Sequence, residues 1–490
     1  MNRTSQIKEL EADREWDCCI IGGGATGLGI AVDAASRGLK TILFERSDLA
    51  KGTSSRSTKL VHGGVRYLQQ GNIKLVLEAL KERGLLLRNA PHLVHNQQFV
   101  IPNYSWWDQP FYGIGLKIYD RMAGKLGLGP SIFLSIEETL ERLPNLDPEG
   151  LTGGVLYHDG QFDDARLAIN LAQTAVAQGA AVLNYFQVEG LLKRNENVTG
   201  VTVKDTENGN NYTVRAKQVI NATGVFTDSI LQMDEPGSAS LINPSQGVHL
   251  VVDKDYLPGT CAIMIPRTDD GRVLFAVPWH DKIVLGTTDT PVDKTEEEPV
   301  AQEQEIEFIL KHIARYLQKD PQRNDVRSVF TGLRPLVKGK TGRTASLSRD
   351  HHLSKSASGL ITITGGKWTT YRKMAQDTVN LMLQDDPRPC ITETMAIAGQ
   401  ISTPIPASLA GLTDTELEPL IRRAVQEEAC MTVEDMLARR SRQLFLDARV
   451  AIEIAPRIAE MMAKERGKDE VWKTEQINIF RNMAGQYLPV

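Results

Sequence analysis

The sequence predicts an α/β fold in which a helix-covered parallel sheet is joined to an antiparallel, β-rich region and a helical C-terminal region. Three observations predict this fold. An apolar run at residues 18–21 leads through a glycine-rich turn into an apolar helix, and a second apolar run follows at 41–45. Strand-like segments dominate residues 247–288. Beyond residue 387 the chain forms three helix-like segments.

The composition is that of a globular protein. The chain has 490 residues, 41% of them hydrophobic and 24% charged, so two or three domains are expected. Its formal net charge of −5 argues against a nucleic-acid partner, because proteins that bind nucleic acid normally carry a basic surface. The five cysteines are scattered and odd in number, and neither they nor the histidines show a metal-ligand spacing. We therefore expect no bound metal, no disulfide framework and a reducing compartment.

The sequence shows neither a targeting segment nor a membrane-spanning segment. Residues 1–17 are polar and lack the apolar core of a signal peptide. No run reaches the roughly 18 to 20 apolar residues that a spanning helix needs. We therefore expect a protein that does not cross a membrane.

The turn after the first apolar run has the Gly-x-Gly-x-x-Gly spacing of a dinucleotide site. Gly22 allows the tight turn, Gly24 lets a pyrophosphate approach backbone N–H groups, and Gly27 lets the helix pack closely. Glu45, roughly 20 residues further on, suits a ribose diol and would repel a 2′-phosphate. The pattern predicts a dinucleotide site but does not distinguish NAD from FAD.

Residues 52–68 are rich in glycine and hydroxyl side chains and come soon after the run that ends at Glu45. Such a segment can donate hydrogen bonds to more phosphate and lie against a flat ring, whereas an NAD enzyme more often continues into its next βαβ unit. The segment resembles the signature of FAD-dependent glycerol-3-phosphate dehydrogenases of the aerobic, respiratory kind. Further motifs that resemble this family follow in its order at residues 221–224, 245–249, 286–289, 331–336 and 365–373.

The resemblance extends from about Trp16 into the C-terminal region. It implies a Rossmann-like FAD-binding domain of the glutathione-reductase or D-amino-acid-oxidase type, an antiparallel β-rich substrate domain and a C-terminal α-helical cap domain. The expected boundaries are 16–95, 155–230 and 330–386 for the FAD-binding domain, 96–154 and 231–329 for the substrate-binding domain, and 387–490 for the C-terminal helical domain.

The resemblance also implies FAD that is bound without a covalent link, because no attachment motif is recognisable. Gly365 and Gly366 precede a helix, whose unpaired N–H groups would stabilise negative charge at the N1/C2=O edge of reduced flavin. Val188 follows a predicted strand at 181–185, and the residue at this position commonly approaches the adenine in this fold. The expected cofactor-binding residues are Gly22, Gly24, Gly27, Glu45, Ser54, Ser57, Thr58, His62, Gly63, Val188, Gly224, Gly332, Gly366, Lys367 and Thr369.

Oxidation of the C2 hydroxyl of glycerol 3-phosphate requires a site for the phosphate dianion, a proton acceptor and a hydride acceptor. Guanidinium and ammonium groups suit the phosphate. The resemblance to the family implies which residues bind the substrate: Arg66, Tyr67, Arg334, Lys367 and Thr370. The alternatives are a solvated surface position for the three cations, a packing role for Tyr67, and helix capping for Thr370 and for Thr369.

His249 is the expected proton acceptor. An imidazole has an unperturbed pKa near neutrality, and this histidine corresponds to an active-site histidine of the family. A structural role for His249 is the alternative. Arg334 or Lys367 would stabilise the developing alkoxide, so these two cations join His249 as the catalytic candidates. His62 is expected to bond the cofactor or the backbone.

Aromatic, aliphatic and cationic side chains are concentrated in residues 104–126, which include Trp106 and Trp107. This mixture suits the headgroup layer of a membrane, with interior packing as the alternative. The family delivers electrons to a membrane quinone, so the resemblance implies a cytoplasmic protein bound peripherally to the inner face of the cell membrane. The oligomeric state stays open, with a homodimer as one alternative.

Three rival functions stay open. A glycerol-3-phosphate oxidase would share the fold and the site but give electrons to O2, and the extra insertion typical of those relatives is not visible here. An NAD-dependent reductase would leave the later motifs without a task. A flavin-binding redox sensor would need neither the cations nor the histidine beside the flavin ring.

Overall fold

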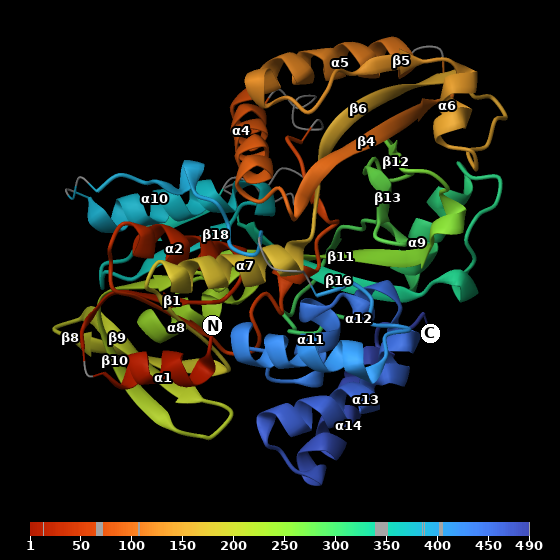
Figure 1. Cartoon of the computed structure of the whole chain (residues 1–490). Coiled ribbons are helices and arrows are strands. Elements are labelled where there is room, and N and C mark those ends of the chain that lie inside the picture. The colour runs from red at the N-terminus through yellow and green to blue at the C-terminus, as the bar shows by residue number, and fades with distance from the viewer. Residues whose placement is uncertain are drawn as a thin grey trace.

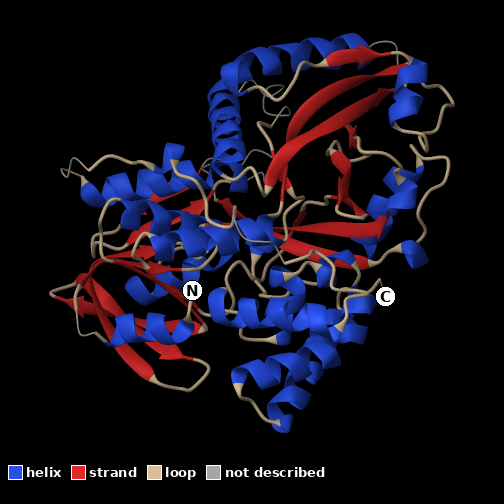
Figure 2. Ribbon diagram, viewed as in Figure 1, coloured by secondary structure: helices blue, strands red, loops and turns tan. Residues whose placement is uncertain are grey.

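The computed structural model describes residues 1–12, 14–64, 72–105, 108–338, 351–384, 386, 388–400 and 405–489. Two large sheets and a C-terminal group of helices form its main layers (Figure 1, Figure 2). This arrangement confirms the predicted fold class, an α/β nucleotide-binding unit with a β-rich unit and a helical region.

The first sheet carries the glycine-rich turn. Its strand order is β17-β18-β10-β1-β2-β7, and its strands run parallel except for β17, which is antiparallel to β18. The strands are β1 (Trp16–Ile21), β2 (Thr41–Glu45), β7 (Ala181–Asn184), β10 (Asn211–Asn221), β17 (His351–Lys355) and β18 (Ile361–Gly365). Because β1 and β2 are buried on both faces of the sheet, they appear in the sequence as continuous apolar runs.

Different elements cover the two faces of this sheet (Figure 1). Alternate side chains of a strand point to opposite faces, so Ile20 packs against the helices α2, α7 and α10, and Cys19 faces the other side. There β8 and β9 extend β10 as an antiparallel ribbon. The elements are α1 (Arg3–Glu11), α2 (Ala25–Ser36), α7 (Asp164–Ala177), α8 (Thr227–Asp234), α10 (Tyr371–Leu383), β8 (Phe186–Arg194) and β9 (Asn197–Asp205).

The second sheet is almost wholly antiparallel, as the sequence predicts. Its order is β15-β11-β14-β13-β12-β4-β6-β3, with β16 paired to β11 and β5 paired to β6. Of the strand pairs in the described part of the chain, the pair β12–β4 is parallel and the others in this sheet are antiparallel. The strands are β3 (Leu60–Val61), β4 (Val94–Asn103), β5 (Ile132–Leu134), β6 (Gly153–Phe162), β11 (Ile242–Asp253), β12 (Ala262–Ile265), β13 (Leu274–Trp279), β14 (Lys282–Gly286), β15 (Thr290–Pro291) and β16 (Ser328–Val337).

The expected domain boundaries do not coincide with the division of the strands between the two sheets. Residues 60–61, 155–162 and 330–337 were expected in the FAD-binding domain, but they lie in strands β3, β6 and β16 of the second sheet. β16 pairs with β11 along its whole length, from Ser328 opposite Val251 to Val337 opposite Ile242. The chain therefore crosses between the two sheets more often than its order of motifs indicates.

Polar side chains cap the first turns of α7 and α4. The carboxylate of Asp163 accepts the N–H of Arg166 at the start of α7, and Asn72 caps α4 in the same way. α5 has no counterpart among the segments predicted from the sequence, and it lies in a stretch, residues 94–148, that contains five prolines. Among the described residues, the other α-helices before the C-terminal region are α4 (Ile73–Asn89), α5 (Asp108–Ala123), α6 (Ile136–Arg142) and α9 (Glu303–Ala314).

The C-terminal helices are held to the first sheet by buried charges. The carboxylate of Asp48, which follows β2, accepts hydrogen bonds from Arg439 at 2.5 Å and from Arg440 at 2.6 and 2.8 Å. The sequence predicts three helices here, whereas the structure has a π-helical turn at 435–440 and four helices. These are α11 (Asp414–Glu427), α12 (Gln443–Leu446), α13 (Ala448–Arg466) and α14 (Glu470–Gly485).

Two further findings concern the whole described chain. All five cysteines are free thiols. Within the described ranges, every helix is too short or too polar to span a lipid bilayer.

Candidate cofactor and active site

Two glycines of the turn after β1 occupy positions that no larger residue could fill. Gly22 has a φ of +113°, and a Cβ atom there would lie 2.6 Å from the carbonyl oxygen of Ala222. A Cβ atom on Gly27 would lie 1.9 Å from the carbonyl oxygen of Gly22. Gly27 therefore lets α2 begin directly against the turn, and the N-terminus of this helix faces the space beyond β1.

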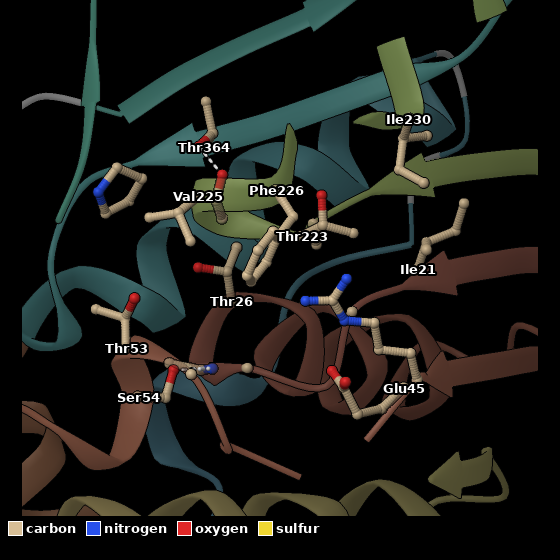
Figure 3. A pocket seen from close by; sticks show the side chains of 18 of the residues that line it. Ile21, Thr26, Glu45, Thr53, Ser54, Thr223, Val225, Phe226, Ile230 and Thr364 are labelled. Carbon is tan, nitrogen blue, oxygen red and sulfur yellow. Dashed lines mark hydrogen bonds between the residues drawn. The ribbon is translucent and has the colours of Figure 1, made fainter. Parts of the chain in front are cut away.

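Glu45 and Ser54 tie neighbouring segments to this turn. The Glu45 carboxylate accepts the N–H of Gly23 at 2.7 Å and of Ser47 at 3.0 Å. Burial raises the pKa of Glu45, while these two hydrogen bonds act to lower it. Ser54 Oγ accepts the N–H of Ala25 at 2.9 Å. In Figure 3, Glu45 and Ser54 lie on one side of the cavity, opposite Thr223 and Phe226.

Two adjoining cavities begin at this turn. The first has a volume of about 340 Å³ and is lined by Gly22, Gly24, Glu45, Ser54, Val188, Gly224, Gly366 and Lys367, among others. The second has a volume of about 220 Å³ and is lined by Ser57, Thr58, His62, His249, Gly332, Arg334, Gly366, Lys367 and Thr369, among others. Thr53, Gly365, Gly366, Lys367 and Trp368 border both. Together the cavities form an elongated space that runs from Val188 to His249.

Three of the predicted contact residues do not line either cavity. Gly27 packs beneath the turn, as described above. The N–H of Gly63 donates to Tyr119 Oη at 2.8 Å, and Thr370 Oγ1 donates to the carbonyl oxygen of Lys367 at 3.3 Å. These three residues support the site from outside. Gly63 and Thr370 form hydrogen bonds with other protein groups, and Gly27 packs directly against the backbone of the turn. Arg66 and Tyr67 lie outside the described residues.

His249 lies on β11 at the wall of the smaller cavity and is 2% exposed. Its Nε2 atom is 2.9 Å from Thr58 Oγ1, and its ring stacks on Phe330 with a centroid distance of 4.8 Å. Among the described residues, Nδ1 has no hydrogen-bond partner. A Cβ atom on Gly286, which faces His249 across the strand pair, would lie 2.4 Å from the imidazole Cδ2. The glycine therefore makes room for the ring.

The surroundings of His249 keep its imidazole neutral. Burial lowers its pKa well below the ordinary value, and the positive charges of Arg334 and Lys59 lower it further. A neutral imidazole can accept a proton, so the position of His249 at the cavity wall suits a general base.

Arg334 and Lys367 bring positive charge to the same cavity. Arg334 lies on β16, and its guanidinium donates to Thr287 Oγ1 at 3.2 Å and to Asp289 Oδ1 at 3.3 Å. A Cβ atom on Gly247 would lie 2.4 Å from this guanidinium, so the glycine makes room for it. Lys367 follows β18 and borders both cavities. The structure therefore brings all three catalytic candidates together.

Hydrogen bonds within the protein hold the loop after β2 in place. Ser57 Oγ donates to Asp164 Oδ2 at 2.7 Å. The backbone N–H of His62 donates to Thr369 Oγ1 at 3.2 Å, and Trp368 Nε1 donates to the carbonyl oxygen of Ser54 at 2.9 Å. These bonds join the loop to α7 and to the turn before α10.

Sequence reasoning missed two buried cations of this loop. Arg56 lines the smaller cavity and donates to Glu298 at 2.6 Å. Lys59 is buried beside Asp164. Their position among the hydroxyl residues of 52–68 could have marked both cations as site residues. Their burial could not be predicted, because their acidic partners lie far away in the sequence. Within the described ranges, no cluster of histidine, cysteine, aspartate or glutamate is arranged to hold a metal ion.

These features form a dinucleotide site, and two family models identify the class of protein as an FAD-dependent oxidoreductase. A family model described as FAD dependent oxidoreductase matches residues 17–372, and a model described as the C-terminal domain of alpha-glycerophosphate oxidase matches residues 407–473. The elongated cavity, the glycine turn and the carboxylate of Glu45 fit a dinucleotide of this kind. FAD, rather than NAD, is therefore the cofactor.

Comparison with known proteins identifies the family within the FAD-dependent oxidoreductases. Human mitochondrial glycerol-3-phosphate dehydrogenase is 40% identical over 98% of this chain and 74% of its own length, and the Schizosaccharomyces pombe protein is 37% identical over 96% and 87%. The solved glycerol-3-phosphate dehydrogenase of Bacillus halodurans, complexed with FAD, has a TM-score of 0.81 at 30% identity and covers 99% of this chain and 97% of that chain. The chain belongs to the FAD-dependent glycerol-3-phosphate dehydrogenase family.

Proposed function

We propose that this protein oxidises sn-glycerol 3-phosphate to dihydroxyacetone phosphate and passes the electrons to a quinone, while bound peripherally to the cytoplasmic face of the membrane. The names of its relatives support the substrate. The observation that carries the proposal is the cavity of about 220 Å³, where His249, Arg334 and Lys367 meet beside the dinucleotide cavity. A base and two cations are what an alcohol phosphate needs from a protein.

Each of the three residues has a distinct task in this proposal. FAD, when bound in the cavity lined by Gly22, Gly24 and Glu45, would supply the hydride acceptor of a two-electron oxidation. His249, neutral near physiological pH, accepts the proton from the C2 hydroxyl. Arg334 and Lys367 bind the phosphate and stabilise the negative charge that develops on the C2 oxygen. The alcohol thus loses one proton and one hydride and becomes a ketone.

The test is an anaerobic experiment with the FAD-loaded protein. Glycerol 3-phosphate should bleach the flavin absorbance, and a quinone should restore it faster than O2 does. Fast recovery with O2 would replace the dehydrogenase by an oxidase, a candidate favoured by the match to the C-terminal domain of alpha-glycerophosphate oxidase. No bleaching at all would support a flavin-binding sensor instead.

Lys367→Ala is expected to weaken the binding of the substrate phosphate. The loss of a charge-assisted contact costs about 1.5–3 kcal/mol, which corresponds to roughly one to two orders of magnitude in affinity. The KM for glycerol 3-phosphate should therefore rise much more than the KM for glycerol, which lacks the phosphate. Steady-state kinetics with both substrates measure the difference, with FAD content determined in parallel.

Lys373→Ala provides the matched control. Lys373 lies on α10 close to Lys367, but it pairs with Asp377 and lines neither cavity. Its removal should leave both KM values near those of the parent. An equal rise for the two substrates in Lys367→Ala would place Lys367 outside the phosphate site.

The face of α5 that points to solvent supports the proposed membrane contact. Phe111, Ile114 and Ile118 recur at helical spacing and are 57%, 61% and 49% exposed. Phe133 of β5, 43% exposed, lies beside them with the ammonium of Lys117 over its ring at 4.8 Å. The opposite face of α5 is buried, so interior packing accounts for only half of this helix. Trp106 and Trp107 lie outside the described residues.

Position and charge also suit this contact. α5 and β5 lie along the outer edge of the molecule, on the side away from the C-terminal helices (Figure 1). Lys117, Arg121 and Lys125 are exposed in the same segment. An apolar face flanked by cations fits the surface of an anionic lipid bilayer, where apolar side chains enter the headgroup layer and cations meet lipid phosphates.

Phe111→Glu combined with Ile118→Glu is expected to reduce binding to vesicles of anionic phospholipid, because two carboxylates would enter the headgroup layer. Quinone turnover should fall with it, while activity with a soluble dye stays the same. Vesicle co-sedimentation at low and high salt measures the binding, which should weaken as salt screens the cations. Val471→Glu with Ile479→Glu, on exposed positions of α14, is the control. Normal sedimentation of the α5 variant would move the contact elsewhere.

A further inference from the structure

The ammonium group of Lys59 is enclosed in the protein interior beside the smaller cavity. Its side chain is 1% exposed, and Nζ lies 2.8 Å from both carboxylate oxygens of Asp164 and 2.6 Å from the carbonyl oxygen of Ser55. Three aromatic rings surround it, with centroids 5.0, 5.1 and 4.9 Å from Nζ, and they belong to Trp279, Phe330 and Phe445. A buried cation needs such a partner carboxylate and such rings to remain charged. Burial lowers the pKa of Lys59, while the charge of Asp164 acts to raise it. The site therefore holds a buried ion pair that the proposed reaction does not use.

Two sets of contacts connect the Lys59–Asp164 pair to His249. Phe330, one of the three rings, stacks on the imidazole with an angle of 15° between the ring planes. Asp164 also accepts the hydroxyl of Ser57 at 2.7 Å and its backbone N–H at 3.1 Å. The next residue is Thr58, whose hydroxyl is 2.9 Å from His249 Nε2. The Lys59–Asp164 pair thus holds two groups against His249: the ring of Phe330, which stacks on the imidazole, and the hydroxyl of Thr58, which faces Nε2.

Several charged or titratable groups face His249 from the elements packed around it. Arg334 on β16 is paired with Asp289, Arg56 in the loop after β2 is paired with Glu298, and Lys59 is paired with Asp164. His62 and Lys367 also line the smaller cavity. Besides burial, only the charges of Arg334 and Lys59 contribute to lowering the pKa of His249. Arg334 also faces the substrate cavity, so Lys59 is the cation whose effect on His249 can be tested without removing a substrate contact.

We propose that Lys59 is a positioning residue for His249: it anchors Phe330 and the Ser57–Thr58 segment against the imidazole, and its charge keeps the imidazole unprotonated and able to accept the substrate proton. This inference rests on the proposed role of His249 as the base. It assigns Lys59 no contact with the substrate. Its effect should therefore appear in the pH dependence of the reaction more than in KM.

Lys59→Met in the FAD-loaded protein is the first test. The rate of flavin reduction by glycerol 3-phosphate is measured anaerobically as a function of pH. Loss of the positive charge should raise the pKa of His249, so the acidic limb should move to higher pH by about one unit. Lys59→Arg keeps the charge and should return the limb toward the parent position. Lys217→Met, an exposed lysine paired with Asp17, should leave it unchanged.

Lys59→Met leaves Asp164 unpaired in the interior, so a second variant covers a failure to fold. Lys59→Met with Asp164→Asn removes both charges, and the limb should still move to higher pH, though by less. An acidic limb at the parent position in a folded, FAD-containing Lys59→Met or double variant would overturn the proposal.

A measurement without turnover separates this inference from the proposed function. His249 is titrated by NMR in histidine-labelled, FAD-loaded protein, with its signal identified by its loss in His249→Gln. If glycerol 3-phosphate does not reduce the parent flavin, the proposed function fails, yet the titration still tests Lys59. The pKa of His249 should be higher in Lys59→Met than in the parent, and equal values would refute the role of the charge.

Discussion

Replacement of His249 by alanine is expected to lower kcat by about two to four orders of magnitude, because the reaction would lose its general base. The effect should appear in the rate of flavin reduction measured by anaerobic stopped flow, and FAD content should stay at the parent level. The pH profile gives a second readout. His249 accepts a proton only in its neutral form, and its pKa is lowered from the ordinary value of about 6.5. The parent should therefore lose activity only as the pH falls well below 6.5, and the variant should lack this limb.

His158→Ala is the matched control for this prediction. His158 on β6 also has a pKa lowered by burial, but it pairs with Asn96 and lines neither active-site cavity. Its rate and pH profile should match those of the parent. If His249→Ala reduces its flavin at the parent rate, His249 has a structural role, and Arg334 becomes the leading candidate for managing the charge on the substrate oxygen.

Gly24→Val is expected to abolish FAD retention. Gly24 caps the N-terminus of α2 and lines the larger cavity, where the pyrophosphate must approach the backbone N–H groups. A Cβ atom there would already lie 3.1 Å from Ser54 Oγ, and the two methyl groups of valine would extend further. Gly24→Ala should therefore weaken retention, and Gly24→Val should remove it. Flavin absorbance of the purified proteins measures the occupancy.

Folding is checked by circular dichroism in each variant. Gly485→Val, at a position where a Cβ atom meets nothing within 4 Å, controls for the loss of a glycine elsewhere. Full FAD occupancy in a folded Gly24→Val protein would contradict the assigned role of the turn and the placement of the pyrophosphate.

Local segments of the fold could be predicted because short-range physics determines them. The turn from Gly22 to Gly27 needs glycines for reasons that involve only its own backbone and its immediate neighbours. The caps at Asn72 and Asp163 likewise act within three residues. Such local features require particular residue types at fixed intervals along the chain. The glycine spacing at residues 22–27 was therefore enough to predict the dinucleotide site.

The membership of strands in sheets could not be predicted in the same way. β16 has the same apolar character as a strand of the first sheet, and its motif lies between two cofactor segments. Its ten-residue pairing with β11 places it in the second sheet. Backbone hydrogen bonds between distant segments depend little on the identity of the side chains, so the sequence does not indicate which sheet β16 joins. α5 was missed for a related reason, because tertiary packing of one face stabilises a helix in a segment rich in prolines.

The sequence alone shows which chemical groups are available for binding and catalysis. They are a dinucleotide turn, a loop of hydroxyl residues, and a histidine and cations in glycine-flanked motifs. Only the tertiary structure decided which of these groups meet. Thr58 and His249 are 191 residues apart and face each other, and Lys59 finds its carboxylate 105 residues away in Asp164. It also decided that the hydroxyl of Ser57 and the N–H of Gly63 bond to protein groups. Strand register and burial determine these contacts, because they fix the distances between residues in the folded protein. The separation of two residues along the chain does not predict that distance.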